Sequence, residues 1–197
     1  MRIVLGFPLE DKQTGEYVRE GFEELGHYVV AVNDPRVLPG PKQILCDVDK
    51  YKPDFVFLAK DPRYNEVIEE LSKKVLTVVW NVDVRYDIGI FLASCGPLYK
   101  YAHLKFTIGK GNLPLYKSAG VKNIYWLSEG ISPTWHRPET VFTYKDHLAY
   151  GNIDVAFAGN RSSPLYNKRA ELLKLLEKED SFDFQVFNGV INREHNK

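Results

Sequence analysis

The feature that most limits the fold of this chain is the regular alternation of short apolar runs with amphipathic segments over residues 1–130. The apolar runs are typical of buried strands, and the clearest are Arg2–Phe7, Tyr28–Asn33, Phe55–Ala59, the run that begins at Val75, and Leu104–Gly109. Residues 14–27 between the first two runs carry Val18 and Phe22 on one helical stripe, and Gly26 is a helix stop. Strands that alternate with helices of this length predict an α/β fold, with a Rossmann-like parallel sheet covered on both faces.

One helix of this series is expected to be broken. Residues 88–102 have helical character, but they contain the pair Gly96-Pro97. Proline lacks the backbone N–H and its ring clashes with the preceding turn, so this pair is expected to interrupt or end the helix.

The chain is predicted to contain a second unit. Residues 133–152 hold two prolines and no clean periodicity, which is typical of a connector. A strand, a Gly-containing turn, a helix and a second strand then follow between Asp154 and Gly189, which is how a nucleotide-binding α/β domain begins. We therefore expect a Rossmann-like domain over 1–132, a connector over 133–152, and the incomplete start of a second such domain over 153–197, as in a truncated parent.

Composition narrows the possible partners. Lys+Arg and Asp+Glu are balanced at 26 each, so no overall field favours nucleic acid or an anionic membrane, and neither partner is expected. No apolar run approaches the ~18–20 residues that span a bilayer, and the N-terminus lacks a signal-peptide pattern. Cys46 and Cys95 have no metal or redox spacing. These features favour a cytoplasmic protein; they leave its oligomeric state open.

The first candidate site follows the first strand. Open parallel sheets bind ligands at the carboxyl ends of their strands. Lys12, Thr14 and Gly15 lie in the loop there and either line a ligand pocket or form a solvated turn. The loop lacks the G-x-G-x-x-G spacing of a dinucleotide site, which disfavours a dehydrogenase.

The second candidate site follows the fourth strand, where Asp83 and Arg85 emerge from an apolar run. A carboxylate at this position is suited to take a proton from an acceptor hydroxyl, so Asp83 is the candidate catalytic base. The alternative is structural: Asp83 caps the next helix or pairs with Arg85.

The third candidate site opens the second unit. Gly159 permits a tight turn, and Asn160 and Arg161 follow it just before a predicted helix. A helix N-terminus beside an arginine is suited to bind a diphosphate.

A metal site is not expected. The D-x-D pair Asp47 and Asp49 precedes a strand, which is the opposite edge of the sheet from the ligand crevice. The five histidines are scattered without ligand spacing. No cofactor is predicted.

Residues 106–138 resemble the end of the N-terminal domain of GT-B-fold glycosyltransferases. The hinge of that family corresponds here to Ser128-Glu129-Gly130-Ile131-Ser132 followed by Trp135-His136-Arg137-Pro138, with Ser132 in place of the usual aspartate. The stretch from Asp154 to Leu176 is similar to the start of the family's nucleotide-sugar domain, and the likeness is strongest to the spore-maturation CgeB-like glycosyltransferases.

The resemblance implies transfer of a sugar from a nucleotide-sugar donor to an acceptor that the sequence does not identify. It places the donor diphosphate near Gly159–Arg161, and the acceptor-side pocket near Lys12, Thr14, Gly15, Arg85, Glu129 and Gly130. Two alternatives stay open: a non-catalytic sugar- or nucleotide-binding module derived from such an enzyme, and a flavodoxin-like signalling domain. The latter predicts acidic residues at the end of the first strand, where this chain has Gly6-Phe7-Pro8.

Overall fold

The computed structural model of the chain describes residues 1–9, 14–31, 40–84, 87–130, 155–159, 167–181 and 183–188. The chain divides into two compact units, Met1–Arg137 and Pro138–Lys197. In the described parts of the chain, no helix is both long and apolar enough to cross a bilayer.

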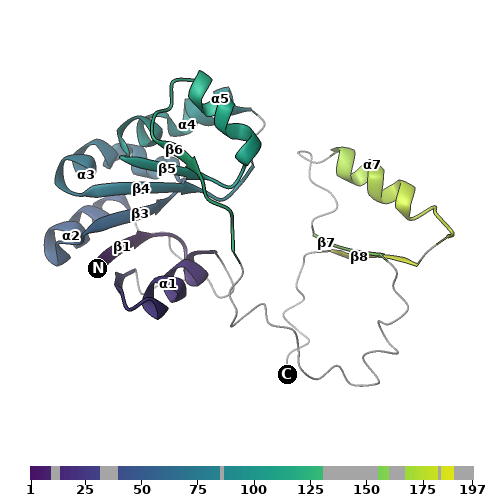
Figure 1. The fold of residues 1–197 in the computed structure, drawn as a ribbon, viewed down its shortest axis with the longest axis horizontal. Coiled ribbons are helices and arrows are strands. Elements are labelled where there is room, and N and C mark those ends of the chain that lie inside the picture. The colour runs from purple at the N-terminus through teal and green to yellow at the C-terminus, as the bar shows by residue number, and fades with distance from the viewer. Residues whose placement is uncertain are drawn as a thin grey trace. The chain divides into compact units, whose positions relative to one another are not determined.

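The first unit is built on a parallel sheet (Figure 1). Its described strands are β1 (Arg2–Gly6), β2 (Tyr28–Val30), β3 (Phe55–Ala59), β4 (Leu76–Asn81), β5 (Leu104–Thr107) and β6 (Ile124–Trp126). They lie in the order β2-β1-β3-β4-β5-β6, and every neighbouring pair is parallel. The α/β, Rossmann-like parallel sheet predicted from the sequence is confirmed.

Helices connect the strands as the alternation predicted. They are α1 (Thr14–Glu24), α2 (Pro41–Tyr51), α3 (Ile68–Lys74), α4 (Ile88–Tyr101) and α5 (Leu113–Ser118), with the 3₁₀ turns η1 (Pro62–Glu66) and η2 (Lys110–Asn112). Crossovers between parallel strands are right-handed. Since only the β1-to-β2 connection runs in the opposite direction along the sheet, α1 must lie on one face and α2–α5 on the other.

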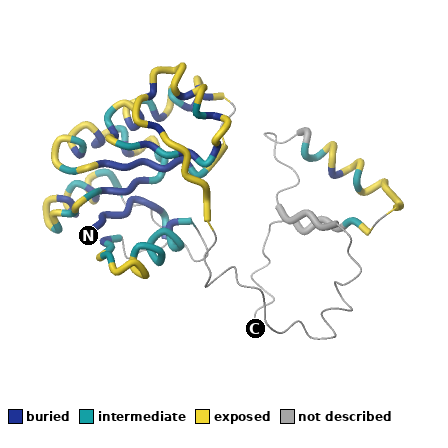
Figure 2. The backbone as a smooth tube through the Cα atoms, viewed as in Figure 1, coloured by how far each residue is buried: buried dark blue, intermediate teal, exposed yellow. Residues whose placement is uncertain are grey.

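The two cores agree with this arrangement. The larger one joins the sheet to α2–α5 and includes Ile44, Leu71, Leu98 and Tyr116. The smaller one lies on the opposite face, where the Phe57 ring stacks on Trp80 and lies tilted against Phe7, with Val18 and Phe22 of α1 packed against this cluster. Figure 2 shows the central strands as the most buried part of this unit.

The prediction that Gly96-Pro97 breaks its helix is wrong, because α4 continues through the pair. Asn65 of η1 explains why. Its Nδ2 donates to the Ser94 carbonyl at 2.7 Å, and its Oδ1 accepts from the Leu98 N–H at 3.1 Å. These two groups would pair with each other in an uninterrupted helix. The side-chain amide therefore fills the gap that the proline opens in the hydrogen-bond ladder.

Gly15 brings α1 close to the end of β1. A Cβ at this position would lie 2.8 Å from the Phe7 Cβ and closer still to the Pro8 carbonyl oxygen. Real Cβ atoms do not approach other atoms so closely, so only glycine lets the first turn of α1 pack here.

The second unit contains the predicted strand–helix–strand order. Its described elements are β7 (Val155–Gly159), α7 (Asn167–Leu176) and β8 (Phe184–Asn188), and β7 pairs with β8 in parallel. This pair forms a sheet separate from the one in the first unit. The predicted connector and the boundary at residue 132 lie outside the described residues.

Candidate functional site

The carboxyl edge of the main sheet carries a charged pair. Lys60 follows the last residue of β3, Asp83 follows β4, and the Lys60 ammonium donates to the Asp83 Oδ2. The register of the two strands, with Ala59 opposite Trp80, brings the two side chains together. The Lys60 side chain is 13% exposed and that of Asp83 is 55% exposed. The cation is thus largely enclosed and the carboxylate faces solvent.

A buried amide positions the backbone of Asp83. Asn81, the last residue of β4, is fully buried. Its Oδ1 accepts from the Asp83 N–H at 3.0 Å, and its Nδ2 donates to the Tyr116 hydroxyl of α5 at 2.9 Å. Asn81, itself held by Tyr116, therefore fixes the Asp83 backbone, while Lys60 bonds to the carboxylate.

The structure excludes one of the structural roles considered for Asp83. The α4 cap is Asp87, whose Oδ1 accepts from the Ile90 N–H at 2.9 Å. The capping alternative for Asp83 is therefore wrong. Its pairing with Arg85 lies outside the described residues; its described partner is Lys60.

A second charged pair follows Lys60 on the same edge. Asp61 caps η1, accepting from the Arg63 N–H at 2.9 Å and from the Arg63 Nε at 3.0 Å. Burial alone would raise the pKa of Asp61, but the hydrogen bonds and charge of Arg63 together outweigh it and lower the pKa. The lowered pKa favours the charged form of Asp61. The carboxyl edge of the sheet therefore carries two ion pairs, Lys60–Asp83 and Arg63–Asp61, and Lys60 and Asp61 are neighbours in the sequence.

The end of β1 is lined by a buried hydroxyl. Tyr64 is fully buried, and its hydroxyl has no hydrogen-bond partner among the described residues. A Cβ at Gly6 would lie 3.0 Å from that oxygen. Burial raises the pKa of Tyr64, so the hydroxyl stays protonated.

The other predicted site residues belong to several different elements of the chain. Thr14 begins α1, and Gly15 is buried at the contact with Pro8, so a packing role accounts for this glycine. Glu129 and Gly130 follow β6 and are exposed, and Gly159 ends β7 in the second unit. Lys12, Arg85, Asn160 and Arg161 lie outside the described residues.

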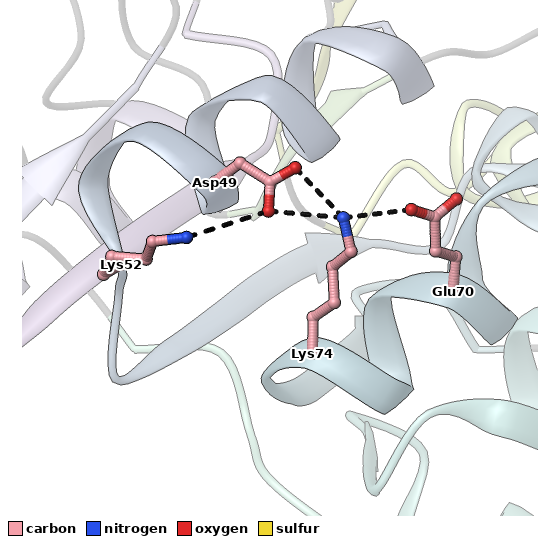
Figure 3. A network of polar contacts seen from close by, with 4 residues as sticks. All are labelled: Asp49, Lys52, Glu70 and Lys74. Carbon is pink, nitrogen blue, oxygen red and sulfur yellow. Dashed lines mark hydrogen bonds and ion pairs between the residues drawn. The ribbon is translucent and has the colours of Figure 1, made fainter.

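The D-x-D pair lies in α2, just before β3, and its side chains are engaged. Figure 3 shows the Asp49 carboxylate between the ammonium groups of Lys74, at 3.0 Å, and Lys52, at 4.0 Å, while Lys74 also contacts Glu70. Asp47 accepts from Gln43 at 2.9 Å. This network links α2 to α3, and no group of three or more candidate metal ligands occurs within the described ranges. The expectation that the pair holds no metal stays a prediction.

Comparisons with known proteins identify the fold. No family model matches the chain, and no curated protein matches its sequence. A solved structure, an alpha-glucosyltransferase in complex with UDP-glucose and DNA containing an abasic site, matches with a TM-score of 0.53 at 12% identity. The match covers 95% of this chain and 67% of that one. This likeness supports a GT-B glycosyltransferase fold, as the sequence predicted.

Sequence reasoning selected Asp83 and missed the residues that hold it. Lys60 carries the same signal as Asp83, since it is the first polar residue after an apolar strand. Asn81 and Tyr116 carry no comparable signal, because their hydrogen bond joins positions 35 residues apart.

Proposed function

We propose that this chain belongs to a GT-B-type glycosyltransferase that moves a sugar from a nucleotide-sugar donor to an acceptor hydroxyl. The observation that carries the proposal is a solvent-facing carboxylate, Asp83, held by Lys60 and Asn81 at the edge where parallel sheets bind ligands. The fold shared with a protein solved with UDP-glucose supports the donor class.

In this proposal the chemistry divides between the two units. Asp83 takes the proton of the acceptor hydroxyl while the oxygen of that hydroxyl forms a bond to the anomeric carbon of the donor sugar. The bond from that carbon to the donor phosphate breaks, and the nucleoside diphosphate leaves with the electron pair. Gly159, Asn160 and Arg161 bind the diphosphate, and the charge of Arg161 offsets the negative charge of the leaving group without a metal. The acceptor lies against Thr14, Gly15, Lys12, Arg85, Glu129 and Gly130.

One observation favours a second candidate, a non-catalytic module that binds sugars or nucleotides. The Asp83 carboxylate already accepts from Lys60. A base must release this partner, or share it, before an acceptor hydroxyl can donate to the same oxygen. In a binding module the ion pair instead contacts ligand hydroxyls directly and stays intact.

We place this enzyme in the CgeB-like family and in the cytoplasm. The family placement rests on the D-V-x-F-x-G phrase that contains β7 and on the leucines of α7. The location rests on the composition, in which two cysteines lack metal or redox spacing.

Titration calorimetry of the chain with UDP-glucose and with UDP tests the donor site. Arg161→Ala should weaken binding by about 1.5–3 kcal/mol, as expected for losing a charge-assisted contact. Lys174→Ala removes an exposed cation from the last turn of α7 and should leave the affinity unchanged. Equal affinities in all three proteins would refute the assignment of Arg161.

Release of UDP from UDP-glucose separates enzyme from binding module. Asp83→Asn should keep donor affinity and abolish turnover, whereas Asp61→Asn, on the same edge, should keep both. Donor binding without turnover in the unmodified chain, under conditions that saturate the donor and across a panel of sugar acceptors, would favour the binding module.

A further inference from the structure

The outer edge of the main sheet combines exposed aromatic rings with an open strand. β6 pairs with β5, and no other described strand lies beside it. Ile124 points into the core, while Tyr125 and Trp126 are 50% and 47% exposed. A tryptophan so exposed at a sheet edge offers a flat apolar surface to a ligand.

The charge of this edge differs from that of the whole chain. Residues 88–128 contain five lysines and neither Asp nor Glu, although the complete sequence is balanced. Three of these lysines surround β6. The Lys110 Nζ lies 5.3 Å from the centroid of the Trp126 ring. Lys117 and Lys122 line a cavity of about 380 Å³ together with Trp126.

We propose that this β6 edge, formed by Lys110, Lys117, Lys122, Tyr125 and Trp126, binds single-stranded nucleic acid. Non-specific recognition of single strands combines lysines that follow the phosphate backbone with aromatic rings on which bases stack. Lys122 precedes β6 and Trp126 ends it, so a cation and an aromatic ring flank the strand. The charge of the whole chain is balanced, and for that reason no nucleic-acid partner was expected. A total for the chain does not reveal that lysines are concentrated around β6.

Charge and ring chemistry favour this occupant over others. A neutral sugar would use Trp126 and leave the lysines without a role. An acidic peptide would use the lysines and the open strand edge, but it gains nothing from Trp126 that a smaller apolar residue would not provide. Glu129, three residues beyond Trp126, is the nearest acid in sequence and is exposed. The inference concerns residues outside the Asp83 site and does not depend on the transferase proposal.

Fluorescence of the intact chain tests the proposal with a dodecamer of deoxythymidine as the probe. Stacking on Trp126 should quench tryptophan emission, and the quenching should disappear in Trp126→Leu. The logarithm of the binding constant should fall with the logarithm of salt concentration with a slope of about −2, the value for three phosphate contacts to a single strand. Trp126→Leu should also weaken binding at least ~5-fold, since base stacking contributes this much or more.

Matched charge variants separate a local site from a general field. Lys117→Gln/Lys122→Gln should reduce the salt slope to about −0.7, because one phosphate contact remains. Lys50→Gln/Lys100→Gln removes the same charge from two lysines that lie over tyrosine rings elsewhere, and should change nothing. Equal weakening in both double variants would overturn the proposal.

The remaining outcomes are equally decisive. If polyphosphate or poly-glutamate competes as well as the oligonucleotide and Trp126→Leu binds normally, the edge attracts any polyanion and the proposal fails. If the lysines only keep strand edges apart, Lys117→Gln/Lys122→Gln will self-associate in sedimentation while the unmodified chain shows no oligonucleotide binding.

Discussion

Asn65 completes the hydrogen bonding of α4 at Pro97, donating to the Ser94 carbonyl and accepting from the Leu98 N–H. The bond joins η1, at the carboxyl edge of β3, to a helix that follows β4. The turn that follows Lys60 and Asp61 is thus tied to α4, the longest described helix, by one side chain.

Asn65→Ala should therefore destabilise the fold by about 1–3 kcal/mol, the contribution of two hydrogen bonds that water replaces only in part. Urea denaturation measures the change. In a Pro97→Ala background α4 can form its regular ladder, so the same substitution should cost less than half as much. An undiminished cost in that background would show that Asn65 acts through some other contact.

Two glycines of α1 should respond to alanine in opposite directions. Gly15→Ala places a Cβ against Phe7 and Pro8, and the overpacking should cost about 1–3 kcal/mol. Gly21→Ala meets nothing within 4 Å and should stabilise the helix by about 0.5–1 kcal/mol. Thermal unfolding of both variants checks the pair. If Gly15→Ala also retains sugar transfer to the acceptor, the glycine serves packing and not acceptor contact.

Two buried tyrosines offer a similar contrast. Tyr64→Phe removes a hydroxyl that has no described partner and should raise the free energy of unfolding by about 1 kcal/mol. Tyr116→Phe removes the hydrogen bond to Asn81 and should lower it by about 1–2 kcal/mol. Because Asn81 holds the Asp83 backbone, the second substitution should also slow any sugar transfer. Equal effects of the two substitutions on stability would contradict this account.

Lys105 of β5 should make stability depend on pH. It is buried, its Nζ donates to the Lys122 carbonyl at 3.0 Å, and burial lowers its pKa. Between the lowered folded pKa and the usual value of 10.5, the unfolded chain binds more protons than the folded one. The contribution of Lys105 to the free energy of unfolding therefore increases as pH rises between these two pKa values, and it is lost as pH falls.

Chemical denaturation of Lys105→Met checks the sign. The difference in unfolding free energy between the unmodified chain and this variant should shift in favour of the unmodified chain as pH rises from 7 towards 10.5. Lys117→Met, which removes an exposed lysine, should show no such trend. A difference that moves in the opposite direction would mean that the buried form is the charged one.

The sequence was sufficient for the parallel sheet because strand and helix periodicities are local properties of the chain. It was insufficient at Pro97, because the compensating amide of Asn65 comes from another element. The candidate site divides in the same way. Asp83 was found from its place after an apolar run, while its pairing with Lys60 depends on β3 lying beside β4 in one register. Strand order and register are set by packing of the whole sheet.

The pairing of β1 with β3 has a consequence during synthesis of the chain. Ile3 pairs with Phe55, 52 residues later, so this buried strand is made long before its inner neighbour. At about 5–20 residues per second the ribosome needs about 3–10 s to complete that stretch. During this interval the run Ile3-Val4-Leu5 has at most the short β2 as a partner. An exposed apolar strand of this kind is prone to aggregation, so β1 is a segment whose folding chaperones would assist.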